Sequence, residues 1–238
     1  MQKSQVEKGD PECQEVISDV TFDESVVQES SFVRPLRMKL ANADEPTKLF
    51  WDMALEHDSV AILLYHKEKQ RIMLVKQFRP AVFVHRIRHY PENSGRNIKE
   101  IDWTKYENQM SVGETFELCA GLMDKARKTP VQTAQEEVLE ECGYSVKPED
   151  ILFLKKYLTG IGISGSAQYL YYCEIDESMK ASEGGGLKTE GEYIEKVYLT
   201  LDEARAISET QDDLSCPPSL LYALSWFLNY KAVPQNYN

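Results

Sequence analysis

One segment of this sequence, residues 129–142, has the periodicity of a helix that must end in a crowd of glutamates. Thr129 can cap its start, Pro130 occupies the first helical position, and Gln132 completes a capping box with Thr129. Gly143 follows where helices commonly end in the left-handed conformation. We therefore predict a helix whose start and end are both set by capping residues. The glutamates near its end need a separate explanation.

Stability alone does not explain these glutamates. Residues three and four apart on a helix face one another, so Glu137, Glu140 and Glu141 share one surface. Like charges so placed destabilise a helix by about 0.2–0.5 kcal/mol per pair, and a helix C-terminus prefers cations. A divalent cation would resolve this conflict, because Mg²⁺ takes carboxylate oxygens and bridges them to substrate phosphates. The alternative is a solvated acidic face without a ligand.

The net charge of the chain limits the classes of ligand that the acidic cluster could bind. The chain has 27 Lys and Arg against 39 Asp and Glu, a formal net charge of −12. It repels the phosphate backbone of nucleic acid, which we therefore exclude as a partner. It would also repel an anionic small substrate, so a nucleotide substrate would need a divalent cation to mediate the contact.

The remaining pattern predicts a mixed α/β chain in which two strands form a hairpin around a short polar turn. The predicted strands are residues 59–65, 71–78, 115–120, 151–158, 168–175 and 193–199, and the closing helices are residues 201–207 and 218–230. Residues 34–40 and 50–55 predict an N-terminal β arm, and residues 86–114 a long surface loop. Residues 1–30 are polar and predict a disordered tail before one domain over residues 31–238.

The cysteines and the N-terminus bear on the cellular compartment. The five cysteines are widely spaced and form no CxxC pair, which indicates reduced thiols rather than disulfides or a zinc site. The N-terminus lacks the apolar core of a secretory signal, and no apolar run approaches the ~18 residues of a membrane span. We therefore expect a cytoplasmic protein with no membrane partner.

The segment GLMDKARKTPVQTAQEEVLEECGY, residues 121–144, resembles the Nudix box, the metal-binding motif of the Nudix hydrolase family. Its Glu137, Glu140, Glu141 and Gly143 stand at the positions that match the motif. This resemblance makes a metal site the preferred interpretation of the acidic helix.

The chain departs from the Nudix box at two positions. Glu136 stands where the motif has an arginine, and Arg127 and Lys128 lie where it has an early glutamate, in a loop one residue longer than usual. These departures keep open a non-catalytic nucleotide-binding module as an alternative function. We expect these departures to affect the rate of catalysis more than the binding of the metal ion.

The segments HDSVAILLY, LVKQFRPAV, ELCAGLMD, GGGL and SWFL resemble the branch of the family that hydrolyses UDP-sugars, over most of residues 31–230. This resemblance implies a Nudix fold, which is an α/β/α sandwich with a mixed sheet, and a homodimer. It also implies Mg²⁺-dependent hydrolysis of a nucleoside diphosphate sugar, UDP-glucose giving UMP and glucose 1-phosphate. ADP-ribose pyrophosphatases share the general plan and are the alternative within the same class of enzyme.

The resemblance also implies which residues form the metal site. The backbone carbonyl of Ala120 and the side chains of Glu137 and Glu141 would hold Mg²⁺, with Glu140 assisting in catalysis. A general base must still reach the attacking water. Glu190 is our first choice and Glu192 the second, because they follow flexible glycines in a loop that could close on substrate. The alternative is that both are ordinary exposed acids.

Two further residues are candidates for substrate binding. Arg79 ends a predicted strand, and its planar fork suits two bonds to diphosphate oxygens. A structural ion pair is the alternative for this arginine. Glu117 is expected to contact the sugar or the base, although an ordinary strand acid explains it equally well.

Overall fold

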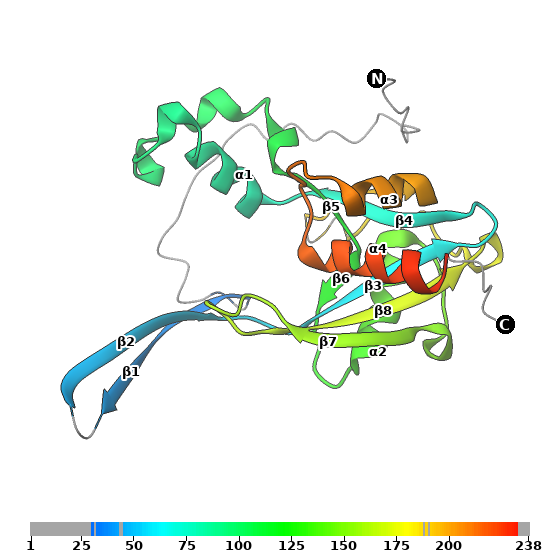
Figure 1. Cartoon of the computed structure of the whole chain (residues 1–238), viewed down its shortest axis with the longest axis horizontal. Helices are drawn as coiled ribbons and strands as arrows, with labels where there is room; N and C mark the ends of the chain where they lie inside the picture. Colours follow the sequence, from blue (N-terminus) through cyan, green and yellow to red (C-terminus); the bar gives the residue numbers. More distant parts are fainter. Residues whose placement is uncertain (1–29, 31, 43–44, 188, 190, 233–238) are drawn as a thin grey trace.

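The computed structural model describes residues 30, 32–42, 45–187, 189 and 191–232. The tail predicted over residues 1–30 therefore lies outside the described residues, apart from Ser30. Seven strands form one mixed sheet in the order β5-β4-β3-β8-β7, with β6 paired to β3 and β9 paired to β4 (Figure 1). The strands are β3 (Ser59–His66), β4 (Arg71–Phe78), β5 (Glu114–Glu117), β6 (Cys119–Leu122), β7 (Leu152–Leu158), β8 (Ala167–Ile175) and β9 (Ile194–Leu199).

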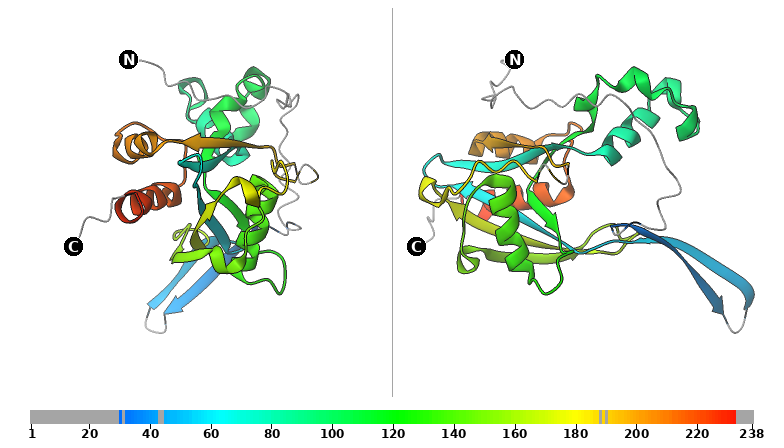
Figure 2. Two further views of the ribbon diagram at one scale, coloured as in Figure 1. Left: turned by 90° about the vertical axis from the view of Figure 1, so that its right-hand side faces the viewer. Right: turned by 180° about the vertical axis from the view of Figure 1, so that it is seen from behind.

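Helices cover both faces of this sheet, which confirms the predicted α/β/α sandwich (Figure 2). Side chains alternate between the two faces of a strand. Val60 and Ile62 of β3 accordingly pack in one core with α2 (Pro130–Glu137). Ala61 and Leu63 pack in the other core, with α3 (Leu201–Glu209) and α4 (Pro218–Tyr230). The centre of the sheet, including β3, is therefore buried on both sides.

The N-terminal arm is present as predicted. Strands β1 (Arg34–Asn42) and β2 (Glu45–Leu55) pair with each other as a separate two-stranded sheet that extends away from the body (Figure 1). Their register places Leu36 opposite Met53 and Met38 opposite Trp51. One face of the arm is therefore lined by apolar residues.

The long surface loop predicted over residues 86–114 is wrong. This segment contains the end of α1 (Pro80–Arg88) and the short 3-10 helices η2 (Pro91–Asn93), η3 (Ile98–Glu100), η4 (Trp103–Tyr106) and η5 (Met110–Gly113). It has a small core of its own, made by Phe83, Ile87, Ile101, Trp103 and Tyr106. Helices of three or four residues are too short to produce a periodic pattern over a window of about 11 residues or more, so the pattern indicated a loop.

The single strand predicted over residues 115–120 is two strands. Leu118 separates β5 from β6, because β5 pairs with β4 whereas β6 pairs with β3. Glu117 and Ala120 therefore belong to different strand pairs, although only two residues separate them in the sequence. The remaining strands and the two C-terminal helices lie where the pattern predicted them.

Two observations concern the cysteines and the membrane. The described cysteines, Cys119, Cys142, Cys173 and Cys216, are all free, and Cys13 lies outside the described residues. Within the part of the chain that the structure describes, no helix has the length and apolarity needed to cross a bilayer.

Candidate active site

The acidic helix is built as its caps predict, with one irregularity at its end. The Thr129 side chain accepts from the backbone of Gln132, whose side chain bonds back to Thr129, and α2 begins at Pro130. At Val138 the helix widens into a π-helical turn, η6 (Val138–Cys142), which carries two of the glutamates. Such turns are rare and occur often at functional sites, because they shift the side chains that follow them.

Glu141 is joined to the strand that enters the helix loop. Its side chain is buried, and Oε2 accepts a 3.0 Å hydrogen bond from the Ala120 backbone N–H. Within a strand, the N–H and C=O of one residue point to the same side. The Ala120 carbonyl therefore faces the side on which Glu141 lies. The pKa of the Glu141 carboxyl is raised to about 8, mainly by burial, and the charge of Glu137 acts in the same direction.

Glu137 lies directly against Gly121. A Cβ atom placed on Gly121 would stand 2.0 Å from Glu137 Oε1, so only glycine leaves room for this carboxyl group. Burial raises the pKa of Glu137 to about 7, and the neighbouring charge of Glu140 acts in the same direction. Glycine at the start of the loop thus leaves room for the Glu137 carboxyl group in its present position.

The donor set fits a magnesium ion that the substrate completes. Glu137 and Glu141 have no cationic side chain within ion-pair distance among the described residues, and burial raises the cost of ionising both. Those residues include no preassembled group of three acidic, histidine or cysteine side chains. Mg²⁺ is commonly held by one or two carboxylates with waters and substrate phosphates, not by an all-protein cage. Two carboxylates beside a backbone carbonyl meet that requirement.

Glu136 and Glu140 lie on the flank of this cluster. Glu136 pairs with two loop lysines, with Lys125 Nζ 3.3 Å from Glu136 Oε2 and Lys128 also in direct contact. Lys125 Nζ is in addition 3.6 Å from Glu140 Oε1. The hydrogen bond from Lys128 holds the pKa of Glu136 below its ordinary value. The four glutamates therefore divide into two paired with lysines and two near the strand backbone.

The two predicted substrate-binding residues pair with each other. Arg79 Nε and Nη2 each donate a 2.8 Å hydrogen bond to one carboxylate oxygen of Glu117. Thr115 donates a third bond to Glu117, of 2.6 Å. The structural ion pair left open as an alternative is thus present, and it uses two of the five donors of the guanidinium. The hydrogen bond to Glu117 raises the pKa of Arg79, and the charges of Glu141 and Glu192 act in the same direction.

The glycine-rich loop is bonded to the end of the acidic helix. Gly185 donates its N–H to the carbonyl of Glu141 at 2.8 Å, and Gly186 donates to the carbonyl of Glu140 at 3.1 Å. A Cβ atom on Gly184 would stand 2.5 Å from the Glu141 carbonyl oxygen, so this close approach requires glycine. These glycines satisfy carbonyls at the helix end that would otherwise be orphaned. They form an anchor in this structure, whereas the sequence suggested a hinge.

Of the two candidate bases, Glu192 is described and Glu190 lies outside the described residues. Glu192 Oε2 accepts a 3.1 Å bond from the Leu187 N–H. Glu192 also lies against Gly186, because a Cβ atom on Gly186 would stand 2.8 Å from Glu192 Cβ, and Gly186 is bonded to the Glu140 carbonyl at the end of the acidic helix. The loop anchored at Gly185 therefore brings a carboxylate to the cluster, and the choice of base stays a prediction.

Sequence reasoning missed one residue that assembles this site. Lys196 of β9 donates to the Cys142 carbonyl at 3.4 Å and contacts the Glu183 carbonyl. It thereby places a positive charge at the negative end of the acidic helix and ties the glycine-rich loop to it. No local signal could identify it, because the contact crosses from a distant strand.

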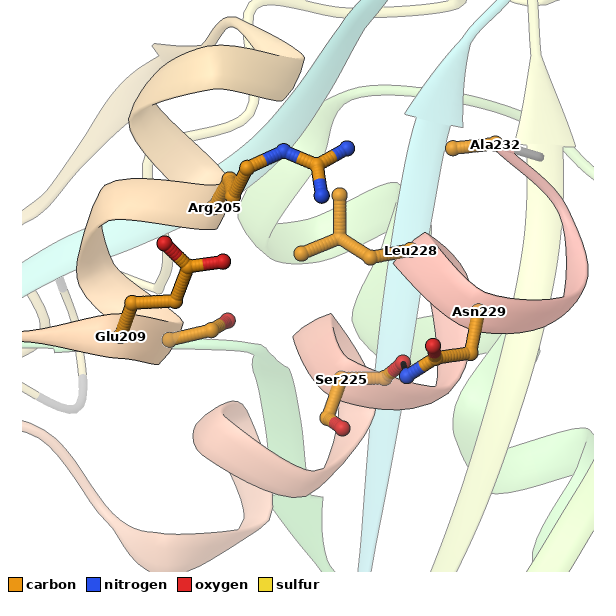
Figure 3. A pocket seen from close by; sticks show the side chains of 7 residues that line it. Arg205, Glu209, Ser225, Leu228, Asn229 and Ala232 are labelled. Carbon is orange, nitrogen blue, oxygen red and sulfur yellow. Dashed lines mark hydrogen bonds between the residues drawn. The ribbon is translucent and has the colours of Figure 1, made fainter.

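A cavity of about 460 Å³ lies away from this cluster, between α3 and α4 (Figure 3). Its lining residues are Arg205, Ser208, Glu209, Ser225, Leu228, Asn229 and Ala232. It shares no residue with the acidic cluster, and its open, mixed lining offers no convergent set of catalytic groups. This cavity therefore does not belong to the candidate active site.

Comparisons with known proteins point to the same chemistry. No protein-family model matches the chain. Uridine diphosphate glucose pyrophosphatase NUDT14 of Mus musculus is 34% identical over 204 residues, which cover 84% of this chain and 90% of that protein. The Bos taurus protein of the same name is 37% identical over 183 residues, covering 75% of this chain and 81% of that protein. A GDP-mannose pyrophosphatase of Citrobacter koseri is 31% identical over 153 residues, covering 64% of this chain and 65% of its own.

Proposed function

The chain belongs to the Nudix hydrolase family, and we propose that it hydrolyses the diphosphate of a nucleoside diphosphate sugar. UDP-glucose, giving UMP and glucose 1-phosphate, is the proposed reaction. The observation that carries this proposal is the convergence of Glu137 and Glu141 on the backbone of Gly121 and Ala120. The two mammalian relatives, which match over most of their length, support the choice of uridine and glucose.

Glu137, Glu141 and the carbonyl of Ala120 are the proposed magnesium ligands. When bound there, Mg²⁺ would neutralise diphosphate charge and polarise a phosphoryl oxygen. Glu140, on the same helical turn as Glu141, is proposed to assist. The acidic chain itself repels a diphosphate, so substrate and ion are expected to bind in mutual dependence.

A base on the glycine-rich loop would complete the hydrolysis. A water oxygen attacks one phosphorus, its proton passes to the base, and the bond from that phosphorus to the bridging oxygen breaks. Glu190 remains our first choice for the base and Glu192 the second. The bonds from Gly185 and Gly186 to the carbonyls of Glu141 and Glu140 hold this loop against the acidic helix and support its role.

Arg79 and Glu117 are proposed to act together on the substrate. The bond pair between them fixes the plane of the guanidinium and leaves three of its donors for a diphosphate oxygen. Glu117 would then position Arg79 and border the sugar or base site. Charge-assisted bonds from an arginine are suited to the diphosphate, whose negative charge the acidic glutamates cannot stabilise.

A homodimer and a cytosolic location are also proposed. An isolated two-stranded hairpin is marginally stable in water. Leu36, Met38 and Trp51 on the arm are 48%, 43% and 58% exposed, so a second copy of the chain is the proposed cover for this face. The cytosol is proposed because the described cysteines carry no disulfide.

A substrate panel with separated products tests the proposed function. UDP-glucose, GDP-mannose and ADP-ribose would each be incubated with Mg²⁺, and with a chelator as the control. We expect UMP and glucose 1-phosphate to form fastest and only with the metal. Faster cleavage of GDP-mannose, the substrate named for the bacterial relatives, or of ADP-ribose would reassign the substrate within the family. No cleavage of any of the three would reject the proposal.

A further inference from the structure

The loop between β6 and α2 carries two lysines that meet one glutamate of the acidic helix. Lys125 and Lys128 both contact the carboxylate of Glu136, from positions 11 and 8 residues earlier in the chain. Lys125 reaches on to Glu140 at 3.6 Å. The loop begins beside Gly121, against which Glu137 lies, and ends at the cap residue Thr129. These contacts therefore close the loop across the same helix that holds the proposed metal ligands.

The backbone of this loop requires such contacts. Arg127, between the two lysines, has φ of 74°, in the left-handed region that non-glycine residues rarely adopt. A backbone of this kind persists only when the surrounding structure holds it in place. The adjacent Lys128 is bonded to Glu136 and supplies one such restraint.

The lysine contacts also offset negative charge at the end of the acidic helix. Four glutamates in six residues repel one another, at the helix end where the macrodipole is already negative. The two lysines offset Glu136 and reach Glu140, whereas Glu137 and Glu141 keep no such partner among the described residues. The loop thereby separates two lysine-paired carboxylates from two that remain available to a cation.

We propose that Lys125 and Lys128 are positioning residues, which hold the helix and its loop together through Glu136 so that Glu137 stays over Gly121. The motif position that carries an arginine in the family is here a glutamate, and its charge partner lies in the loop as a lysine. The expected effect on turnover rests on the proposed function. The role of the lysines in holding the loop does not depend on it.

Charge reversal tests the pairing. We expect Lys128→Glu and Glu136→Lys each to lower kcat for UDP-glucose at saturating Mg²⁺ by about tenfold or more, with little change in KM. The double variant Lys128→Glu/Glu136→Lys restores the pair between these two positions but leaves Lys125 facing a lysine, so kcat should recover by at least about threefold over either single variant. The matched control is Lys67→Glu, which breaks the remote 3.0 Å pair with Asp176 and should leave kcat unchanged.

A second readout does not depend on catalysis. Amide hydrogen exchange over residues 122–129, measured without metal, should accelerate in each single variant and return in the double variant. If the charge reversals prove too unstable to purify, Lys128→Gln and Glu136→Gln replace them, and each should accelerate exchange in the same segment.

The outcomes separate the two proposals. An inactive wild type with faster exchange in the single variants rejects the nucleotide-sugar hydrolase and keeps the positioning role. An active wild type whose single variants keep both rate and exchange overturns the positioning role, as does a double variant that fails to recover. Equal loss in Lys67→Glu would show a general effect of charge and would also overturn it.

Discussion

Glu141 accepts a 3.0 Å hydrogen bond from the backbone N–H of Ala120, which joins the last turn of the acidic helix to the strand that precedes its loop. This bond fixes one carboxylate beside the Ala120 carbonyl, and the helix then places Glu137 against Gly121. Two side chains four residues apart are thereby aligned with two consecutive backbone positions. The alignment gives the site its shape before any ion or substrate arrives.

Gly121→Ala should weaken metal binding with little loss of stability. The new methyl group would stand 2.0 Å from Glu137 Oε1 and must displace that carboxylate from its place. We expect the affinity for Mg²⁺ in the presence of UMP to fall by about tenfold or more, as for loss of one ligand or its support. Gly162→Ala is the matched control, because nothing lies within 4 Å of its added Cβ. Equal Mg²⁺ affinity in both variants would contradict the placement of Glu137.

The stability of the metal-free protein should fall as the pH rises towards 8. The pKa values of Glu137 and Glu141 are raised to about 7 and about 8 by burial, whereas an unfolded glutamate titrates near ~4.3. Between these values the folded state binds more protons than the unfolded state. The free energy of unfolding is therefore highest below the unfolded pKa and is lost as the pH rises through the folded values.

Mg²⁺ should reverse this loss, because it binds the ionised carboxylates. We expect saturating Mg²⁺ to raise Tm more at about pH 8 than at about pH 6, by at least ~3 °C in difference. Calorimetry with and without metal measures this, and Glu137→Gln/Glu141→Gln is the control in which the Mg²⁺ effect disappears. A metal effect that is independent of pH would show that these two groups do not bind the ion.

The loop base can be identified by comparing two glutamine variants. Loss of a general base lowers kcat by about 10²–10⁴-fold with little change in KM, and it removes the acidic limb of the rate profile. We expect this result for Glu190→Gln. Glu192→Gln, which keeps an acceptor for the Leu187 N–H, should cost only a few-fold. The reverse order would assign the base to Glu192, and comparable small losses would remove both from catalysis.

The arm can be tested by placing charge on its apolar face. Met38 and Trp51 pair across β1 and β2 and are both exposed in one copy of the chain. We expect Met38→Glu/Trp51→Glu to convert a dimer into a monomer in sedimentation experiments, because a buried unpaired charge is costly at an interface. Lys39→Glu, at the adjacent position of β1, is the control that should remain dimeric. A monomeric wild type would reject the dimer.

Local signals explain how much of this fold the sequence could predict. The helix that begins at Pro130 was predictable because its cap and its terminating glycine lie within the segment itself. The strands of the main sheet were predictable because their apolar runs are bounded by polar turns. The two-strand division at Leu118 was not, because it depends on which neighbour each half pairs with.

Contacts between distant segments explain what the sequence could not predict. The pairing of Arg79 with Glu117 depends on the alignment of β4 and β5, in which Gln77 faces Thr115. The contact of Lys196 with the helix end depends on the path of β9. The helical segment after α1 packs against α1 through contacts such as that of Phe83 with Trp103, whose ring centroids are 6.1 Å apart although the two residues are distant in the sequence. Composition carries none of this information.

Isothermal titration of Mg²⁺ into the wild type and into Glu141→Gln, each with and without UMP, tests the central claim most directly. We predict a saturable binding isotherm for the wild type that tightens when the nucleotide is present, and at least about a tenfold weaker affinity for Glu141→Gln. Glu149→Gln, a remote and exposed acid in η7 (Pro148–Asp150), should bind as the wild type does. A wild type that takes up no Mg²⁺ under either condition, or a Glu141→Gln variant that binds it equally well, would contradict the account.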